Sequence, residues 1–266
     1  MQDAAALFNN IQVVPVEESL ASAALDGDGS LTQQVYVVLR RLAVELRLLP
    51  NQSLSEKDVA DGLRVSRTPV REAFIRLAED GVVRIVPKSG TYVATIDFSQ
   101  AGEGYFVWGA LESSCAGRLA EKHSLRDIGA LRDLVGDEED ARSADDLTRF
   151  RLANNAFHDA IFDLAEFPAA KKLTDSAKFE VDRIRNVLQM HRLVPMEKMV
   201  QSHTDIVNSI AGGDAEDAER RMAEHLEELR QATKRMVEDR EFQRYYQFLN
   251  QKRIGKRRPR GKRDDV

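Results

Sequence analysis

The stretch Leu54–Val93 decides the fold: L-S-E-K-D-V-A-D-G-L-R-V-S-R-T-P-V-R-E-A-F-I-R-L-A-E-D-G-V-V-R-I-V-P-K-S-G-T-Y-V. Ser55, with an acidic residue three positions later, predicts the start of a short helix. A second helix begins within S-R-T-P, with either Ser66 or Thr68 as its N-cap. The β-branched runs on either side of P-K-S-G then predict a hairpin over residues 82–96.

Another helix precedes this stretch. Ser30 and Gln33 form a capping box, and apolar residues then recur at helical spacing, which predicts a helix over 31–47. The order helix, short helix, helix and hairpin is typical of a winged helix-turn-helix domain, which we assign to residues 30–97. Residues 1–29 show no sustained period and are turn-rich and acidic, so we expect a flexible N-terminal extension there.

Strand signals stop after residue 97, and amphipathic segments follow one another. They lie at about 100–121, 124–139, 147–165, 168–190, 196–211 and 214–247. Such segments joined by short loops predict an all-α bundle of about six helices over residues 98–248. Residues 249–266 are strongly basic, and we expect them to form a disordered tail. The whole chain is therefore predicted to be mainly α.

The net charge of -5 over 266 residues is unevenly distributed. Residues 31–96 carry ten basic and seven acidic side chains, whereas residues 97–251 carry twenty-one basic and thirty acidic ones. The positive excess in the predicted helix-turn-helix segment indicates an anionic partner. No apolar run approaches the length of a membrane helix and no secretory signal is present, so we expect a cytoplasmic protein. Cys115 is the only cysteine, which excludes an internal disulfide framework.

The helix that begins at S-R-T-P carries side chains suited to reading DNA. Arg67 and Arg71 can each form a bidentate pair with guanine, and Thr68 can bond a phosphate or a base. Unpaired N–H groups at the N-terminus of the helix add a site for a phosphate. The alternative is a solvated charged face on which these arginines pair with Glu72 and Glu79.

Residues 54–93 resemble the DNA-binding domain of the GntR family of bacterial transcription regulators, whose hallmark is close to L-S-E-x-x-L-A-x-x-L-G-V-S-R-T-P-V-R-E-A-L-x-x-L-E-x-x-G-L-V. This resemblance implies that a homodimer binds a near-palindromic operator in double-stranded DNA. Arg64 stands where the family usually has glycine; it can add a phosphate contact, at a cost of about 1 kcal/mol if its backbone is left-handed. The candidate DNA contacts are Lys57, Arg64, Arg67, Thr68, Arg71, Lys88 and Gly90.

Three of the five histidines lie beside the apolar stripes of three different predicted helices: His158, His203 and His225. Asn154 precedes His158 by four residues and so shares its helix face. Three imidazoles and one oxygen suit a divalent transition metal such as zinc or nickel. Spacing alone leaves open the alternative that these are ordinary buried or surface histidines.

Residues 97–247 resemble the effector-binding helical domain of the FadR subfamily, the FCD domain. In that domain D-x-x-F-H, E-H-x-x-I and a final H-L supply one Asp and three His to a metal. N-A-F-H, S-H-T-D-I and E-H-L occur here in the same order. The resemblance implies a metal at Asn154, His158, His203 and His225, with a small organic acid as effector beside it. Asn154 replaces the usual Asp, which weakens the expected metal site by one negative charge.

Trp108 is a second departure, because many members of the subfamily have there an arginine that contacts the effector carboxylate. Arg183 and Arg185 could supply the missing charge from another helix. The alternative is that both are exposed and pair with Asp182 or Glu180.

The sequence thus favours a ligand-responsive DNA-binding regulator, more commonly a repressor. One alternative is a zinc-dependent enzyme with an accessory DNA-binding domain, but no H-E-x-x-H or comparable acid-base motif is present, so we expect no enzymatic activity. Another is a DNA-binding architectural protein whose helical domain binds no ligand.

Overall fold

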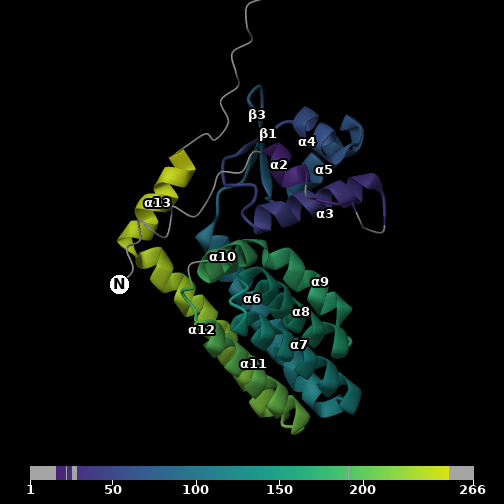
Figure 1. Ribbon diagram of the computed structural model, residues 1–266, viewed down its shortest axis with the longest axis vertical. Coiled ribbons are helices and arrows are strands. Elements are labelled where there is room, and N and C mark those ends of the chain that lie inside the picture. The colour runs from purple at the N-terminus through teal and green to yellow at the C-terminus, as the bar shows by residue number, and fades with distance from the viewer. Residues whose placement is uncertain (1–15, 22, 26–28, 191, 252–266) are drawn as a thin grey trace, which may run out of the picture. The chain divides into compact units, whose positions relative to one another are not determined.

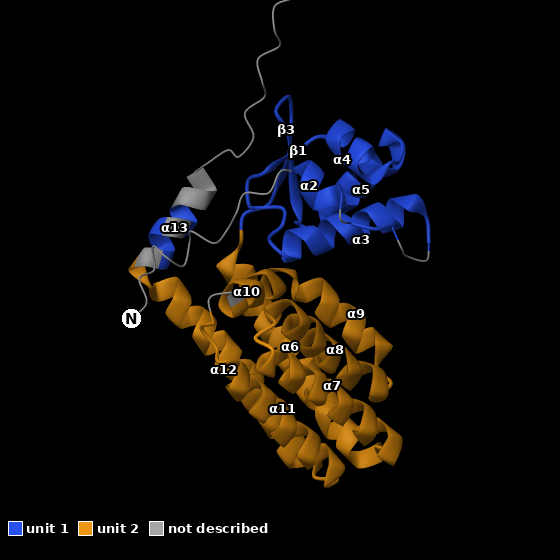
Figure 2. Cartoon of the chain, in the orientation of Figure 1, with its two compact units in different colours: residues 1–95, 241–266 blue, residues 96–240 orange. Residues whose placement is uncertain are grey.

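The computed structural model describes residues 16–21, 23–25, 29–190 and 192–251. The chain is mostly helical, which confirms the mainly α prediction, and it divides into two compact units (Figures 1 and 2). Unit 1 comprises residues 1–95 and 241–266, and unit 2 comprises residues 96–240. Among the described residues, no helix is long and apolar enough to cross a membrane.

Unit 1 has the predicted order of helices followed by a hairpin. Its elements are α2 (Val16–Ala21), α3 (Leu31–Val44), β1 (Ser53–Leu54), α4 (Glu56–Leu63), α5 (Arg67–Glu79), β2 (Val83–Val86) and β3 (Gly90–Val93), followed after unit 2 by α13 (Arg240–Gln251). The strands form an antiparallel sheet in the order β1-β3-β2, with Val83 opposite Val93 and Ser53 opposite Tyr92. The short strand β1, which the sequence analysis did not predict, extends the predicted wing by one strand.

Helix α5 presents its apolar side to the core of unit 1. Val70, Phe74 and Leu77 are buried, as their helical spacing predicts, and α5 packs on α3. Ser66 is the N-cap residue, with extended backbone angles, so Arg67 and Thr68 lie in the first turn. The opposite face of α5 is thereby left to solvent.

The expectation of a flexible extension up to residue 29 is wrong for Val16–Ala21, which form helix α2. Leu20 is fully buried, and α2 packs on α4. A Cβ on Gly62 would stand 2.9 Å from Leu20 Cδ1, so glycine is required there for the close approach of α2. Although glycine often ends a helix, Gly62 lies within α4.

Helix α4 ends instead at Arg64, whose backbone is left-handed, with φ 57° and ψ 40°. Its N–H donates to the carbonyls of Ala60 and Asp61, which closes the last turn of the helix. This is the geometry in which a helix C-terminus ordinarily uses glycine, because a Cβ is strained there. Arg64 thus occupies a position suited to glycine.

Unit 2 is a helical bundle. Its helices are α6 (Phe98–Lys122), α7 (Leu125–Ser143), α8 (Leu147–Leu164), α9 (Pro168–Ala177), α10 (Phe179–Met190), α11 (Met196–Ala211) and α12 (Ala215–Glu238). Side chains at the predicted boundaries cap several of them: Ser124 forms a capping box with Asp127, and Asp146 accepts the N–H of Arg149. Helix α6 lies among the others and contacts each of α8 to α12 (Figure 1).

Two predicted boundaries within the bundle are wrong. The segment 168–190 is two helices, α9 and α10, with a break at Lys178, so the described part of unit 2 has seven helices rather than six. The segment 214–247 ends at Glu238, because Asp239 is extended, and α13 follows. Residues 249–251 of the expected tail belong to α13, and residues 252–266 lie outside the described residues.

Candidate DNA-binding surface and metal centre

The seven predicted DNA contacts are all exposed: Lys57, Arg64, Arg67, Thr68, Arg71, Lys88 and Gly90. Lys57 pairs with Asp61 at 3.2 Å, and both side chains are exposed to solvent. No acidic side chain of the described residues pairs with Arg64, Arg67, Arg71 or Lys88. These four cations are therefore available to an anionic partner.

In the described structure no ion pair joins Arg67 or Arg71 to Glu72 or Glu79, as the alternative required. The Glu72 carboxylate instead accepts the Thr32 hydroxyl at 2.7 Å. The arginine of α5 that is engaged within unit 1 is Arg76. It donates to Gln33 at 2.7 Å and lies 4.6 Å above the centre of the Tyr36 ring. Arg67 and Arg71, one turn apart near the start of α5, remain on the exposed face.

Ile75 lies one turn after Arg71 on the same face of α5 and is 48% exposed. An apolar side chain at this place suits the methyl group of thymine, which lies in the major groove. The helical spacing of the sequence already separated Ile75 from the buried stripe, but it was not included among the predicted contacts.

The tip of the wing is shaped by backbone that L-residues rarely adopt. Lys88 has φ 61° and Gly90 has φ 136°, and the N–H of Ser89 donates to the carbonyl of Val86 at 3.0 Å. This turn carries the Lys88 side chain into solvent. The wing therefore presents a positive charge at its end, as the sequence predicts.

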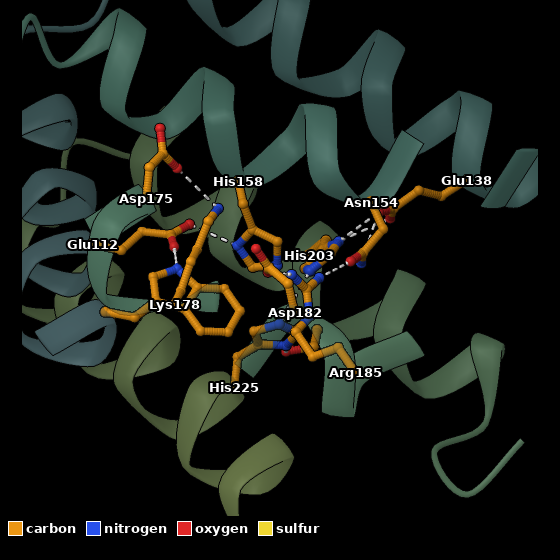
Figure 3. Close-up of polar contacts among 12 residues, drawn as sticks. Glu112, Glu138, Asn154, His158, Asp175, Lys178, Asp182, Arg185, His203 and His225 are labelled. Carbon is orange, nitrogen blue, oxygen red and sulfur yellow. Dashed lines mark hydrogen bonds and ion pairs between the residues drawn. The ribbon is translucent and has the colours of Figure 1, made fainter. Parts of the chain in front are cut away.

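In unit 2, His158 of α8, His203 of α11 and His225 of α12 converge in the interior (Figure 3). All three rings are at least 95% buried, and one nitrogen of each lies within 4.8 Å of the others. The Nε2 atoms of His203 and His225 are 3.2 Å apart. The sequence therefore located three side chains that the fold does bring together.

The outer nitrogens of these rings are held by neighbouring side chains. Nδ1 of His158 lies 2.7 Å from Glu112, and Nδ1 of His203 lies 2.8 Å from Glu138. Nδ1 of His225 lies 3.1 Å from the Ser202 hydroxyl. A carboxylate at Nδ1 fixes the ring with its Nε2 lone pair free, which is the arrangement found around metal-ligating histidines.

His158 Nε2 supports this interpretation, because it is buried and has no hydrogen-bond partner among the described residues. Burial, the charge of Arg185 and the neighbouring His203 and His225 hold the pKa of His158 well below its usual value. Burial and His203 likewise lower the pKa of His225. Both rings are thus kept neutral, which is the form that binds a metal. Three imidazoles of this kind fit zinc or nickel.

Glu112 and Glu138 are the carboxylates of this centre, and both are fully buried. Burial raises the pKa of Glu112 to about 8, against the opposing effects of Lys178 and the Trp108 indole. A divalent cation at the histidines would favour the charged form of this carboxyl group. Sequence reasoning missed both residues, although Glu112 follows Trp108 by one helical turn.

Asn154, the fourth predicted ligand, is buried beside the histidines but is engaged elsewhere. Its side-chain oxygen accepts a hydrogen bond from Arg185, and its amide donates to Glu138 at 3.2 Å. Figure 3 shows Asn154 and Glu138 together on one side of the rings, with Glu112 on the other. The group that could hold a metal ion in the described structure is thus the three histidines, without Asn154.

Trp108 is fully buried in this centre. Its indole N–H donates to Glu112, and its ring meets His158 edge-on, with ring centres 5.0 Å apart. The Arg185 guanidinium lies 4.8 Å from the centre of the indole ring, and the Lys178 ammonium lies 5.9 Å from it. Two cations therefore adjoin the tryptophan that stands in place of an arginine.

The alternative that Arg183 and Arg185 are exposed is wrong, because both are buried. Their predicted acidic neighbours are correct: Arg183 pairs with Glu180 at 3.3 Å and Arg185 with Asp182 at 3.5 Å. Arg185 also donates to Asn154, beside the histidines. Lys178, which the sequence analysis did not single out, supplies the second cation.

A helix-turn-helix with unpaired surface cations and a wing, joined to a helical domain with a buried polar centre, defines a DNA-binding regulator. Residues 31–93 match the family "Bacterial regulatory proteins, gntR family", and residues 103–248 match the FCD domain. The chain belongs to the gntR family of bacterial regulatory proteins, with an FCD domain.

Known proteins agree with this assignment. The chain is 32% identical over 209 residues to the HTH-type transcriptional repressor RspR of Escherichia coli (strain K12), covering 79% of this chain and 91% of that protein. Among solved structures, E. coli McbR/YncC superposes with a TM-score of 0.69 at 20% identity, covering 79% of this chain and 99% of that one. A putative GntR transcriptional regulator from Rhodococcus sp. RHA1 superposes with a TM-score of 0.64 at 25% identity, covering 77% of this chain and 98% of that one. The chain is accordingly a transcription regulator and not an enzyme.

Proposed function

We propose that the chain is a homodimeric repressor whose affinity for a near-palindromic operator changes when a small organic acid binds beside a metal ion in the FCD domain. The observation that carries this proposal is the convergence of three buried histidines whose outer nitrogens are already held by Glu112, Glu138 and Ser202. The named repressor RspR supports the sign of regulation. Because it acts on DNA, such a regulator works in the bacterial cytoplasm.

On the operator, α5 of each protomer enters the major groove of one half-site, since its exposed face carries Arg67, Thr68 and Arg71. Arg64 and Lys57 lie on or next to α4, where they can contact the phosphates beside the groove. Lys88 and Gly90 at the wing tip do the same from the hairpin. A homodimer matches its own twofold symmetry to that of the operator.

His158, His203 and His225 would hold the metal, zinc or nickel by their donor atoms. When bound, the ion supplies a positive charge and an open coordination position for a carboxylate oxygen. Glu112 and Glu138 keep the histidine rings oriented and offset the charge of the ion. These roles require no displacement of a side chain that is paired elsewhere.

Arg185 and Lys178 are suited to the rest of the organic acid. The carboxylates of Asp182 and Asp175 raise the pKa of Lys178 although burial acts to lower it, so the ammonium stays charged. Arg185 is charged under all ordinary conditions and donates to a neutral acceptor, Asn154. An effector carboxylate is a stronger acceptor than this amide, so binding would draw Arg185 towards the effector.

Helix α10 joins this centre to the residue that follows the DNA-binding segment of the chain. Arg185 lies on α10, and Glu180 at the start of the same helix accepts the backbone N–H of Asp97. Asp97 is the N-cap of α6, directly after the helix-turn-helix segment. A shift of α10 on effector binding would therefore act at this junction and change the spacing of the two DNA-binding units, which alters operator affinity.

Metal analysis of protein purified without a histidine tag tests the site. We expect about one metal ion per chain, lost from His158→Ala, His203→Ala and His225→Ala. His123→Ala is the matched control, because this half-buried histidine bonds the Ala120 carbonyl at the end of α6, away from the cluster. Equal metal content in all four variants, each folded by circular dichroism, would refute the metal centre.

The effector is tested by operator binding in fluorescence anisotropy, with a panel of small organic acids and with metal-loaded or chelated protein. We expect one acid to lower the operator affinity of the loaded protein, and Arg185→Gln to abolish that response while leaving operator binding without the acid unchanged. If neither metal nor any acid changes operator affinity, the helical domain has a structural role instead.

A further inference from the structure

Helix α2 lies outside the segment that matches the gntR family, which begins at residue 31. It nevertheless packs on α4, the helix that precedes the turn to α5 (Figure 1). Its six residues are too few to form a stable helix in isolation, because the first helical turn is unfavourable and few hydrogen bonds follow it. The helix therefore owes its structure to the surface on which it is docked.

Two neighbouring residues anchor α2 to the rest of unit 1. The Ser19 hydroxyl donates to the Arg47 carbonyl at 3.0 Å, and the Arg47 guanidinium donates to the Ser19 carbonyl at 3.1 Å. Leu20 is fully buried and lies against Gly62. Arg47 follows α3, and Gly62 lies in the last turn of α4. Helix α2 thus ties the end of one helix to the end of the next.

The glycine at position 62 is explained by this docking. Glycine in the interior of a helix is less favourable than alanine, so an isolated α4 would gain from a side chain there. The three atoms nearest to a Cβ on Gly62 all belong to Leu20, at 2.9 to 3.5 Å. A larger residue would therefore push Leu20, and α2 with it, away from α4.

The docked helix leaves the exposed face of α4 open. Lys57 and Asp61 are four positions apart, share one face and are both exposed. Gly62 is one position further, which is about 100° round the helix. Helix α2 can therefore hold α4 from the flank without covering the face that carries the candidate phosphate contact Lys57.

The turn held by α2 is also the turn that ends at Arg64, whose backbone is left-handed, with φ 57°. Strained backbone of this kind persists only where the surrounding structure holds it. The Arg64 N–H donates to the carbonyls of Ala60 and Asp61, directly before Gly62. The packing of Leu20 on Gly62 therefore restrains the turn that directs Arg64 and leads the chain into α5.

We propose that α2 positions α4 for operator DNA, with Leu20 acting through Gly62 as the positioning residue. The contacts that it positions are those of Lys57 and Arg64 with phosphate, so the proposal rests on the DNA contacts proposed above. When α2 is docked, α4 is held in the geometry that meets the operator, and less conformational entropy is lost on binding. When α2 is undocked, the last turn of α4 frays and both contacts weaken.

The test compares two variants of the full chain with matched controls. Leu20→Ala removes the side chain that packs on Gly62, and Leu31→Ala makes the same change at a leucine of the same unit that is 50% exposed. Gly62→Ala adds the Cβ that would meet Leu20, and Gly129→Ala adds one at a helical glycine with open space around it. Circular dichroism checks that every variant is folded.

Limited digestion with a protease that cleaves after glutamate reports the docking of α2. Glu17 and Glu18 are exposed, but they lie in a helix that must open before the protease can cut it. We expect cleavage at these two residues to be at least about 5-fold faster in Leu20→Ala and Gly62→Ala than in the unaltered chain and the controls. Equal cleavage in all of them would refute the docking contact.

Operator binding is measured by fluorescence anisotropy over a series of salt concentrations, on a labelled duplex selected by the unaltered chain from random DNA. Leu20→Ala and Gly62→Ala should raise the Kd at least about 5-fold and flatten the dependence of log Kd on log salt, because phosphate contacts weaken in both protomers. A loss of stability alone would lower the active fraction and leave the salt slope unchanged. The two changes combined should bind no more weakly than Leu20→Ala, since the added Cβ then displaces nothing.

Arg64→Ala, measured beside them, separates the positioning role of α2 from the DNA contacts themselves. If Arg64→Ala weakens binding while Leu20→Ala is cleaved faster but keeps the Kd and salt slope of the unaltered chain, the positioning role is refuted and the contacts stand. If Arg64→Ala has no effect either, the phosphate contact of Arg64 falls and the positioning role falls with it. Weaker binding with an unaltered salt slope, or additive effects in the combined variant, would also overturn the positioning role.

Discussion

Arg64 combines a strained backbone with a charge placed for DNA, and substitutions can separate the two. Its φ of 57° closes α4, and its side chain is exposed and free of any acidic partner in the described structure. Replacement by glycine should stabilise unit 1, because glycine adopts this backbone without a Cβ clash. The same replacement should weaken operator binding, since one cation is lost.

The magnitude follows from the backbone angle. A left-handed L-residue costs about 1 to 2 kcal/mol, and the larger entropy of glycine in the unfolded chain returns about 0.5 to 1 kcal/mol of this. Arg64→Gly should therefore raise the free energy of unfolding by about 1 kcal/mol, which corresponds to a rise in Tm of about 4 to 8 °C for a unit of this size. The exposed side chain contributes no burial that would offset the gain.

Arg64→Ala is the matched variant, because it removes the charge and keeps the Cβ. Both variants should flatten the dependence of log Kd on log salt by about one unit per protomer, or about two units for the dimer on its operator, while only Arg64→Gly should raise Tm in calorimetry. Equal Tm values for the two variants would refute the strain at this position. An unchanged salt slope in both would show that Arg64 does not touch phosphate.

Three further predictions concern the DNA surface, the bundle and the tail. Arg67→Ala and Arg71→Ala should each cost about 1 to 3 kcal/mol of operator affinity and relax base preference at one position, measured by anisotropy on single-base operator variants. Gly104→Ala should lower Tm in calorimetry, because its Cβ would stand 2.6 Å from the Ala177 carbonyl, whereas Gly129→Ala, with open space around it, should raise Tm slightly. Deleting residues 252–266 should weaken binding to all DNA sequences alike and flatten the salt dependence, because eight basic side chains are removed; an unaltered slope would mean that the tail does not contact DNA.

The helix-turn-helix unit was predictable because its signals are local. Capping residues, the buried stripe of α5 and the β-branched runs of the wing each depend on neighbours in sequence. Helix α2 escaped prediction because its six residues are too few to show a helical period. Its stability depends on the fit of Leu20 against Gly62, a contact between residues far apart in the chain.

No local residue reveals the break between α9 and α10, since Lys178 is neither glycine nor proline. The carbonyl of Ala177 approaches α6 at Gly104, where any side chain would block it. At the next residue α9 ends, and the Lys178 ammonium lies near the Trp108 ring.

The histidines were predictable because histidine is a rare residue that commonly binds metals. The residues that contact their Nδ1 atoms are of common types and could not be recognised from the sequence. A glutamate on an amphipathic helix is ordinarily solvated, so only the fold shows that Glu112 and Glu138 are fully buried at the histidine Nδ1 atoms. The direction of Arg185 was left open by the sequence for the same reason. Both arginines are buried, and their contacts distinguish them: Arg185 donates to Asn154 of α8, whereas Arg183 pairs with Glu180 of its own helix.

The two departures from the family pattern offset one another in charge. Asn154 in place of aspartate removes a negative charge from the centre, and Trp108 in place of arginine removes a positive one, so the sum is unchanged. Arg185 donates a hydrogen bond to Asn154, the residue in the place of the aspartate. Its guanidinium also lies over the ring of Trp108, the residue in the place of the arginine. The arginine of this centre thus lies on α10 and not on α6. An anion that bound here and attracted Arg185 would therefore act on α10, the helix whose Glu180 accepts the backbone N–H of Asp97.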